Sequence, residues 1–444
     1  MAVVTLGITA KADSKLRKMV GVGSLVAVVV VIGLFSLRRT PFVRAIPAVG
    51  SLLNTSFVEG TAGTRLMSWQ IAIESWQEKP VFGWGINNFF YAFNEHYRPE
   101  FLEHGWGETW FDNAHNIVVN TLATQGVLGV VTYLGIFGAA VWMLIVGYRA
   151  GRTDQATLVF GFGFLSAHLT QAAFVFENPT SYLYFFFTLA LLNQSSAPAV
   201  TLSKGEKTSV EKPLGMPLII TACAVGLLVI YTVNIRVANA NKLALKSLQA
   251  LYSDPNKALD WYNQALMAGS PHVDDIRADF ARVVDQLLPQ YIQAKQPGLA
   301  LKLFKTAYEG LKQNRQLHPY DIRNQINIAQ LALTGANLEN KPSYLLEAQE
   351  ALEDALKKSP RRQQVQYLLA GLYTQTGQKD QAVVLLKEAW NANKKIEGNW
   401  WRLALAYHEN GQKEEAKALF VEADLFGIKF TTQGEQIRTM VQAK

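Results

Sequence analysis

Cysteine is almost absent from this chain of 444 residues, which contains Cys223 alone. That excludes an intramolecular disulfide and a cysteine metal cluster, so folding must rest on burial and helix packing. Charged residues are scarce in the first half of the chain, although 17% of all residues are charged and 49% are hydrophobic. The two halves are therefore expected to fold in different solvents, the first in lipid and the second in water.

The formal net charge of +7 arises largely from basic residues that flank apolar segments. This placement favours anionic lipid headgroups or phosphates as partners and argues against nucleic acid. The residues concerned are Lys11, Lys15, Arg17, Lys18, Arg38, Arg39, Arg44, Arg149 and Arg152.

Five apolar stretches are candidates for membrane spans, each of which needs about 20 mostly apolar residues. They lie at 19–37, 119–147, 157–176, 181–194 and 216–234, and the fourth is short. The first could instead be a signal peptide, although its length and the lack of an A-x-A site favour an uncleaved span. The sequence thus predicts an all-α fold with a polytopic membrane domain of about five spans.

Basic residues in short loops predict the orientation of these spans. The start of the chain, the loop at 148–152 and the linker at 195–215 would be cytoplasmic, which places the loop at 38–118 and everything after 235 outside. The basic stretch RRTPFVR at 38–44 is an exception, because the charge rule would place it inside.

After about residue 240 the pattern changes to amphipathic helices with an internal period of 34 residues. Residues 367–390 align with 401–424, so that small, aromatic and glycine positions recur in pairs. Weaker copies of the second helix occur upstream. The pairs are Ala370/Ala404, Tyr373/Tyr407, Gly377/Gly411, Ala382/Ala416 and Ala389/Ala423, and the upstream copies are Ala258/Tyr262/Ala265, Ala300/Phe304/Ala307 and Ala348/Leu352/Ala355.

This pattern resembles the tetratricopeptide repeat and predicts an α-solenoid. The predicted division is a membrane domain at 1–195, a linker and last transmembrane helix at 196–235, and an extracytoplasmic repeat domain at 236–444. A concave repeat face usually binds a peptide or protein. A spacer or a dimerisation arm is the alternative.

Aromatic residues are concentrated in the predicted external loop, between Trp69 and Phe111. Trp69 and Trp84 are candidates for stacking on sugar faces, although aromatics also gather at membrane interfaces. The stretch TRLMSWQIAIESW predicts a helix in which Arg65 lies one turn before Trp69. Arg65 needs an anion there, and a side chain reaching lipid headgroups is the alternative. Pro80, Gly83 and Gly85 then predict a tight turn.

His115 follows in FDNAHNIVVN, where Asp112 or Asn113 is expected to cap the next helix and Asp112 to reach the imidazole ring. The spacing from this histidine is distinctive. Asn116 comes next, followed after nine residues by Gly126 and after two more by Gly129. The segment has no metal-ligand spacing.

This arrangement resembles the His-[Asn/Ser/Gln]-x9-Gly-x2-[Gly/Thr/Tyr] pattern of the O-antigen ligase and polymerase family. Arg65 in RxxxWxxA, followed by PVFGWGINNF, resembles the preceding stretch of that family. The resemblance covers about residues 60–195. It implies a metal-independent transfer of glycan, without a cofactor, from an undecaprenyl diphosphate carrier to a lipid or protein acceptor at the outer face of the bacterial inner membrane.

The resemblance suggests a role for each candidate residue. Arg65 would stabilise the charge of the leaving group, with Arg38 and Arg39 as further contacts to the carrier. His115 would act as the base, oriented by Asp112 or Asn116. Trp69 and Trp84 would bind substrate, and Gly126 and Gly129 would allow close helix contact. The family has about ten or more spans, so basic residues from its earlier spans have no counterpart here.

Two other functions remain open at this stage. The chain could be a non-catalytic, membrane-anchored repeat scaffold for envelope assembly. A transporter-like protein is the weaker alternative, because no intramembrane acidic residue supports it apart from Glu177, which lies near a span end and is better interpreted as part of a loop. The repeats favour a protein partner, and the identity of the acceptor stays undetermined.

Overall fold

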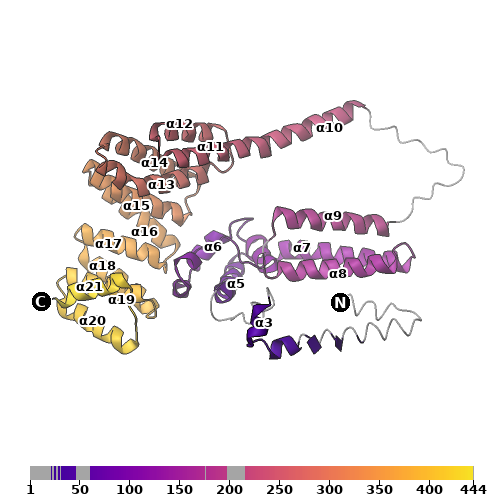
Figure 1. Ribbon diagram of the computed structural model, residues 1–444, viewed down its shortest axis with the longest axis horizontal. Coiled ribbons are helices and arrows are strands. Elements are labelled where there is room, and N and C mark those ends of the chain that lie inside the picture. The colour runs from indigo at the N-terminus through magenta and orange to yellow at the C-terminus, as the bar shows by residue number, and fades with distance from the viewer. Residues whose placement is uncertain are drawn as a thin grey trace. The chain divides into compact units, whose positions relative to one another are not determined.

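The computed structural model describes residues 22, 25, 26, 29, 30, 32–46, 61–175, 177–197 and 216–443. All regular elements within this described part are helices (Figure 1), which confirms the predicted all-α class. The chain divides into two compact units. Unit 1 comprises Met1–His96 and Glu100–Thr201, and unit 2 comprises Tyr97–Pro99 and Leu202–Lys444. The predicted boundaries at 195 and 235 stay predictions.

Three long helices of unit 1 lie side by side, with α5 and α6 near one end of them (Figure 1). Their core is formed by Phe137 and Leu144 of α7, Leu158 and Leu165 of α8, and Phe185 of α9. The elements of this part of the chain are α3 (Pro41–Ala45), α5 (Thr61–Glu78), α6 (Phe89–Glu95), the 3-10 turns η1 (Pro99–His104) and η2 (Trp106–Thr109), α7 (Ile117–Arg149), α8 (Gln155–Ala172) and α9 (Pro179–Ser196).

Two helices in the described part are long and apolar enough to cross a membrane, Ile117–Arg149 and Met216–Ala250. They contain the predicted spans 119–147 and 216–234. The predicted spans 157–176 and 181–194 fall on α8 and α9, which have 18 residues each and do not meet the same criterion. Eighteen residues rise about 27 Å, slightly less than a typical hydrocarbon core. Within 19–37, residues 19–21, 23, 24, 27, 28 and 31 lie outside the described residues, so the count of five stays a prediction.

Unit 2 begins with one continuous helix, made of α10 (Met216–Val229), a π turn η3 (Ile230–Ile235) and α11 (Arg236–Ala250). The apolar side chains of α10 are exposed, as is Cys223. Helices then follow in antiparallel pairs (Figure 1). They are α12 (Pro255–Met267), α13 (Val273–Gln293), α14 (Pro297–Leu317), α15 (Ile322–Glu339), α16 (Ser343–Lys358), α17 (Gln363–Gln375), α18 (Lys379–Ala392), α19 (Glu397–Glu409), α20 (Lys413–Phe426) and α21 (Thr432–Gln442).

The predicted repeat pattern is confirmed in the last helix pairs of unit 2. Gly377 (φ 80°) and Gly411 (φ 83°) both adopt the left-handed conformation in the turns after α17 and α19, where a residue with a Cβ would be strained. The paired alanines at 370/404, 382/416 and 389/423 are all buried, with exposed fractions of 1% or less. Small side chains at these positions let the paired helices approach closely.

Helix α7 is kinked at Gly126, which has φ 68° and ψ −164°. At the kink, backbone groups of the loop at residues 80–85 take the place of hydrogen-bond partners within the helix. Four backbone hydrogen bonds join loop and helix, from Trp84 N–H to Ala123 O (2.9 Å), Gly85 N–H to Thr124 O (2.8 Å), Val127 N–H to Pro80 O (2.9 Å) and Leu128 N–H to Val81 O (3.4 Å). We call this arrangement the Gly126 interlock.

Two glycines make the interlock possible. A Cβ on Gly126 would lie 2.3 Å from Val81 O, and a Cβ on Gly83 would lie 2.4 Å from the carbonyl carbon of Thr124. Both residues also have positive φ. The close approach expected at Gly126 therefore exists, but its partner is a loop backbone and not another helix. Gly129 is buried one turn further along α7, where a Cβ would lie 3.1 Å from Thr121 Cγ2.

Replacing Gly126 by alanine should destabilise unit 1 by more than about 2 kcal/mol, because the new Cβ meets backbone and the φ is strained. Gly135→Ala is the matched control in the same helix, since a Cβ there meets nothing within 4 Å. Thermal unfolding of both variants in detergent should show a lower midpoint for Gly126→Ala alone. Equal midpoints would contradict the interlock.

Candidate functional site

Helix α5 carries two of the predicted site residues and holds them against neighbouring segments. The indole Nε1 of Trp69 donates to Ala114 O (2.8 Å), directly before His115. Nη1 of the half-buried Arg65 donates to Phe174 O (3.3 Å) in the turn after α8. Among the described residues no carboxylate forms an ion pair with Arg65, so its guanidinium retains donors for an anionic ligand.

Three asparagine side chains fix the backbone around His115. Asn113 Oδ1 accepts from the His115 N–H (2.9 Å), and Asn120 Oδ1 accepts from the Ala114 N–H (3.2 Å). Asn116 Oδ1 accepts from the N–H groups of Val118 (3.0 Å) and Val119 (3.2 Å) and so caps α7. The prediction that Asp112 or Asn113 caps this helix was wrong, because the extended residue directly before the first helical turn is Asn116.

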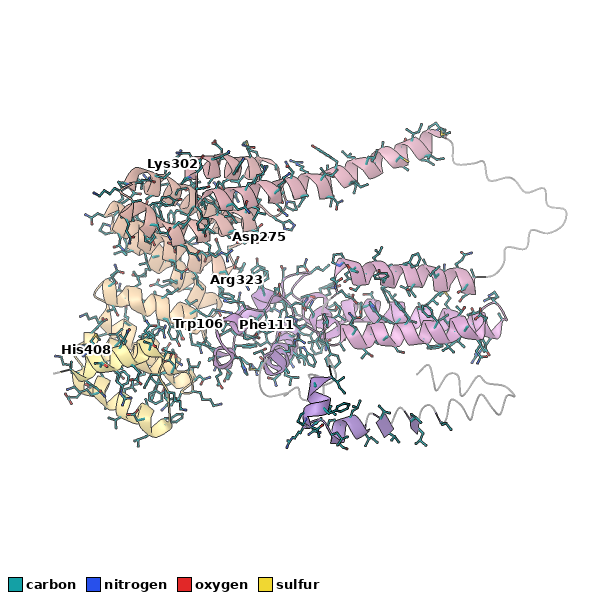
Figure 2. The ribbon with its side chains drawn as sticks, viewed as in Figure 1. Trp106, Phe111, Asp275, Lys302, Arg323 and His408 are labelled. Atoms are coloured by element: carbon teal, nitrogen blue, oxygen red, sulfur yellow. The ribbon has the colours of Figure 1, made fainter. Side chains whose placement is uncertain are left out.

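His115 itself has a left-handed backbone, with φ 53°. Such a conformation costs about 1 kcal/mol or more in a residue with a Cβ and is often retained at functional sites. Its ring meets the edge of Phe111 at a centroid distance of 5.5 Å. Phe111 (labelled in Figure 2) also contacts the buried rings of Phe93 and Phe101, at 5.3 and 5.4 Å. The histidine is thus fixed by its backbone and by a packed aromatic cluster.

Burial lowers the pKa of His115, and the positive charge of Arg65 lowers it further. The charges of Asp112 and Glu108 act in the opposite direction. Arg65, Asp112 and His115 therefore lie in one electrostatic neighbourhood. With its pKa lowered, the imidazole is neutral near pH 7 and can accept a proton.

The other predicted residues occupy different surroundings. The indole Nε1 of Trp84 donates to Ser75 O (2.8 Å), and Lys79 Nζ lies 3.6 Å from the centroid of a Trp84 ring. Trp84 therefore has a structural role in the loop of the interlock. Arg38 places its guanidinium 4.0 Å from the ring centroid of Phe35. Arg39 is exposed in the same turn before α3. Substrate binding by Trp84, Arg38 and Arg39 stays a prediction.

Several residues of the site were not predicted. Glu108 accepts from Thr64 Oγ1 (2.9 Å) and acts on His115 through its charge. Asn120 closes the loop before α7, and Phe174 contributes the carbonyl that orients Arg65. Glu177 pairs with His168, at 2.8 Å between carboxylate and imidazole. The one sequence signal for the asparagines was their density around His115, whereas the others depend on contacts between distant segments.

The first part of the chain has the sequence of an O-antigen ligase domain. The O-antigen ligase family profile matches residues 1–134. Two tetratricopeptide repeat profiles match residues 345–403 and 398–424. These matches confirm both resemblances noted in the sequence, to O-antigen ligases in the first part of the chain and to tetratricopeptide repeats near its end.

Two solved structures are similar to part of the chain. A thermophilic TPR protein in Thermus thermophilus is 20% identical, with 41% of this chain and 89% of that chain covered and a TM-score of 0.29. The MamA protein is 17% identical, with 48% of this chain and 97% of that chain covered and a TM-score of 0.30. A search of curated protein sequences found no match.

The electrostatic neighbourhood of His115 can be tested by titration. Arg65→Gln removes a positive charge that disfavours the imidazolium, so the pKa of His115 should rise. Asp112→Asn removes a negative charge and should lower it. Both shifts can be followed by NMR of protein with labelled histidine, in which His115→Gln assigns the signal. An unchanged pKa in Arg65→Gln would contradict the arrangement.

Proposed function

We propose that the protein is a membrane glycosyltransferase that transfers a glycan from an undecaprenyl diphosphate carrier to an acceptor in envelope polysaccharide or glycoprotein synthesis. The observation that carries this proposal is that helix α5 holds Arg65 in the electrostatic neighbourhood of His115, with Trp69 of the same helix bonded to Ala114 O, inside the region that matches O-antigen ligases. A neutral base beside a cation with free donors suits a reaction that deprotonates a hydroxyl and expels a diphosphate.

The proposed reaction is a displacement at the anomeric carbon of the carrier-linked sugar. His115 accepts the proton of the acceptor hydroxyl as its oxygen forms a bond to that carbon. The bond between the carbon and the phosphate oxygen breaks, and undecaprenyl diphosphate leaves with the electron pair. Arg65 stabilises the charge of the leaving group. Asp112 and Glu108, whose charges favour protonation of His115, stabilise the imidazolium that forms.

The membrane helices determine where this site would operate. His115 closely precedes the first of the two helices able to cross a membrane. We place this end of α7 at the outer face of the bacterial inner membrane, because basic residues gather at the opposite end, with Arg149 and Arg152. On this topology the carrier diphosphate and His115 lie at the same membrane surface. The chain is then multi-pass, and its repeats are extracytoplasmic.

The repeats support a protein partner, which could be the acceptor itself or an assembly factor. A second candidate function is a membrane-anchored scaffold without catalysis. The observation favouring it is that unit 2 is built of helix pairs from α11 to α21, of which residues 345–424 match repeat profiles. The two functions differ in their requirement for Arg65 and His115, since a scaffold should tolerate replacement of either residue.

Glycan transfer in a bacterial strain lacking its own ligase provides the test. His115→Ala should reduce transfer by about 100-fold or more and Arg65→Ala by a similar factor, at matched membrane levels. His104→Ala and Arg282→Ala are the matched controls, since they remove the same residue types from outside the neighbourhood of His115, and Arg282 is exposed in α13. Full transfer by the His115 and Arg65 variants would favour the scaffold.

A further inference from the structure

A second ionisable pair lies within unit 1, formed by His168 in the last turns of α8 and Glu177 in the turn before α9. His168 Nε2 is 2.8 Å from Glu177 Oε1, and the two side chains are only 9% and 5% exposed. The two atoms are in close polar contact, although no hydrogen bond of good geometry joins them. Buried ionisable groups among apolar helices are costly and usually have a role.

Three helices converge on the Glu177 carboxylate. Ser181 of α9 donates to Oε2 (2.5 Å), and Tyr133 of α7 donates to Oε1 (3.5 Å). Two oxygens that each accept a hydrogen bond are typical of an ionised carboxylate. His168 contacts this carboxylate from α8, and its ring stacks on Phe185 of α9 at a centroid distance of 4.3 Å.

The contact between His168 and Glu177 joins the two sides of the turn whose Phe174 carbonyl orients Arg65. His168 and Glu177 lie on either side of this turn, and Phe174 within it accepts the hydrogen bond from Arg65 Nη1. Asn178 caps α9 and fixes the end of the turn. Its Oδ1 accepts from the Ser181 N–H, and its own N–H donates to Ser181 Oγ. Displacing Glu177 would therefore move the carbonyl that fixes the guanidinium.

We infer that His168 and Glu177 are positioning residues for Arg65, and that through the Phe174 carbonyl they set the affinity of the site for a lipid-linked diphosphate. This inference rests on the proposed function. It assigns a role to Glu177 that its place in a loop did not suggest. Neither residue contacts the reacting atoms, so replacing either residue should change the binding of the carrier.

The test is binding of undecaprenyl diphosphate to the full chain in detergent micelles, measured by native mass spectrometry. Glu177→Gln keeps the shape of the side chain but removes its charge, and it should raise the Kd about tenfold, which corresponds to the loss of one charge-assisted interaction. Thr170→Ala is the matched control, because Thr170 lies two residues from His168 on the exposed side of α8. Its Kd should change less than about twofold.

A double-mutant cycle separates positioning from a general structural effect. In an Arg65→Lys background, Glu177→Gln should add less than about twofold to the Kd, because the carbonyl that it displaces no longer orients a guanidinium. A full tenfold effect in that background, or none in the wild-type background, would overturn the inference. If Glu177→Gln fails to fold, the neutral pair His168→Gln with Glu177→Gln leaves no unpaired buried charge and should show the same tenfold loss.

The proposed function and this inference can fail separately. A wild-type chain that binds the carrier without transferring glycan would contradict the proposed function, while the Kd values would still decide the role of Glu177. A wild-type chain that does not bind the carrier would overturn both.

Discussion

The exchange of backbone hydrogen bonds at Gly126 is the constraint on which the rest of unit 1 depends. Peptide groups of a kinked apolar helix have no water to satisfy them in a membrane, so another part of the chain must supply partners. The loop at 80–85 does so with four backbone hydrogen bonds. This ties the segment after α5 to α7, and Trp69 of α5 donates to Ala114 O in the segment before α7, beside His115. Arg65 and His115 are therefore fixed relative to one another by two separate links.

The chemistry of the candidate site follows from what surrounds this rigid frame. Desolvation and a neighbouring cation favour a neutral imidazole, whereas two carboxylates favour the imidazolium that proton transfer would form. Arg65 has a backbone carbonyl as its described partner, which orients the guanidinium without neutralising it. A base that is neutral before the reaction and a cation available to an anion are the two groups that transfer from a lipid diphosphate requires.

Sequence periodicity predicted the helical class, the α5 helix and the repeat positions, because each depends on local spacing. Gly377 and Gly411 ended their helices as expected. The motif spacing singled out Arg65 and His115, which lie in one electrostatic neighbourhood, and their catalytic roles stay predictions. The sequence could not predict that Asn116 and not Asp112 caps α7, since neighbouring residues compete for that position. Nor could it predict the contacts of Glu108, Phe174 and Glu177, which join segments distant in the sequence. Polar residues in α8 and α9, which leave both helices less apolar than the two that could cross a membrane, also limited the prediction of spans.

The central claim is that the loop at 80–85 and the kinked helix form one hydrogen-bonded unit. Hydrogen exchange of the full-length protein, read by mass spectrometry, tests this directly. The account predicts that the amides of Trp84, Gly85, Val127 and Leu128 exchange as slowly as those of the regular part of α7, and that Gly83→Ala accelerates all four together. Exchange of the loop amides at the rate of an exposed loop, in the wild-type protein, would contradict it.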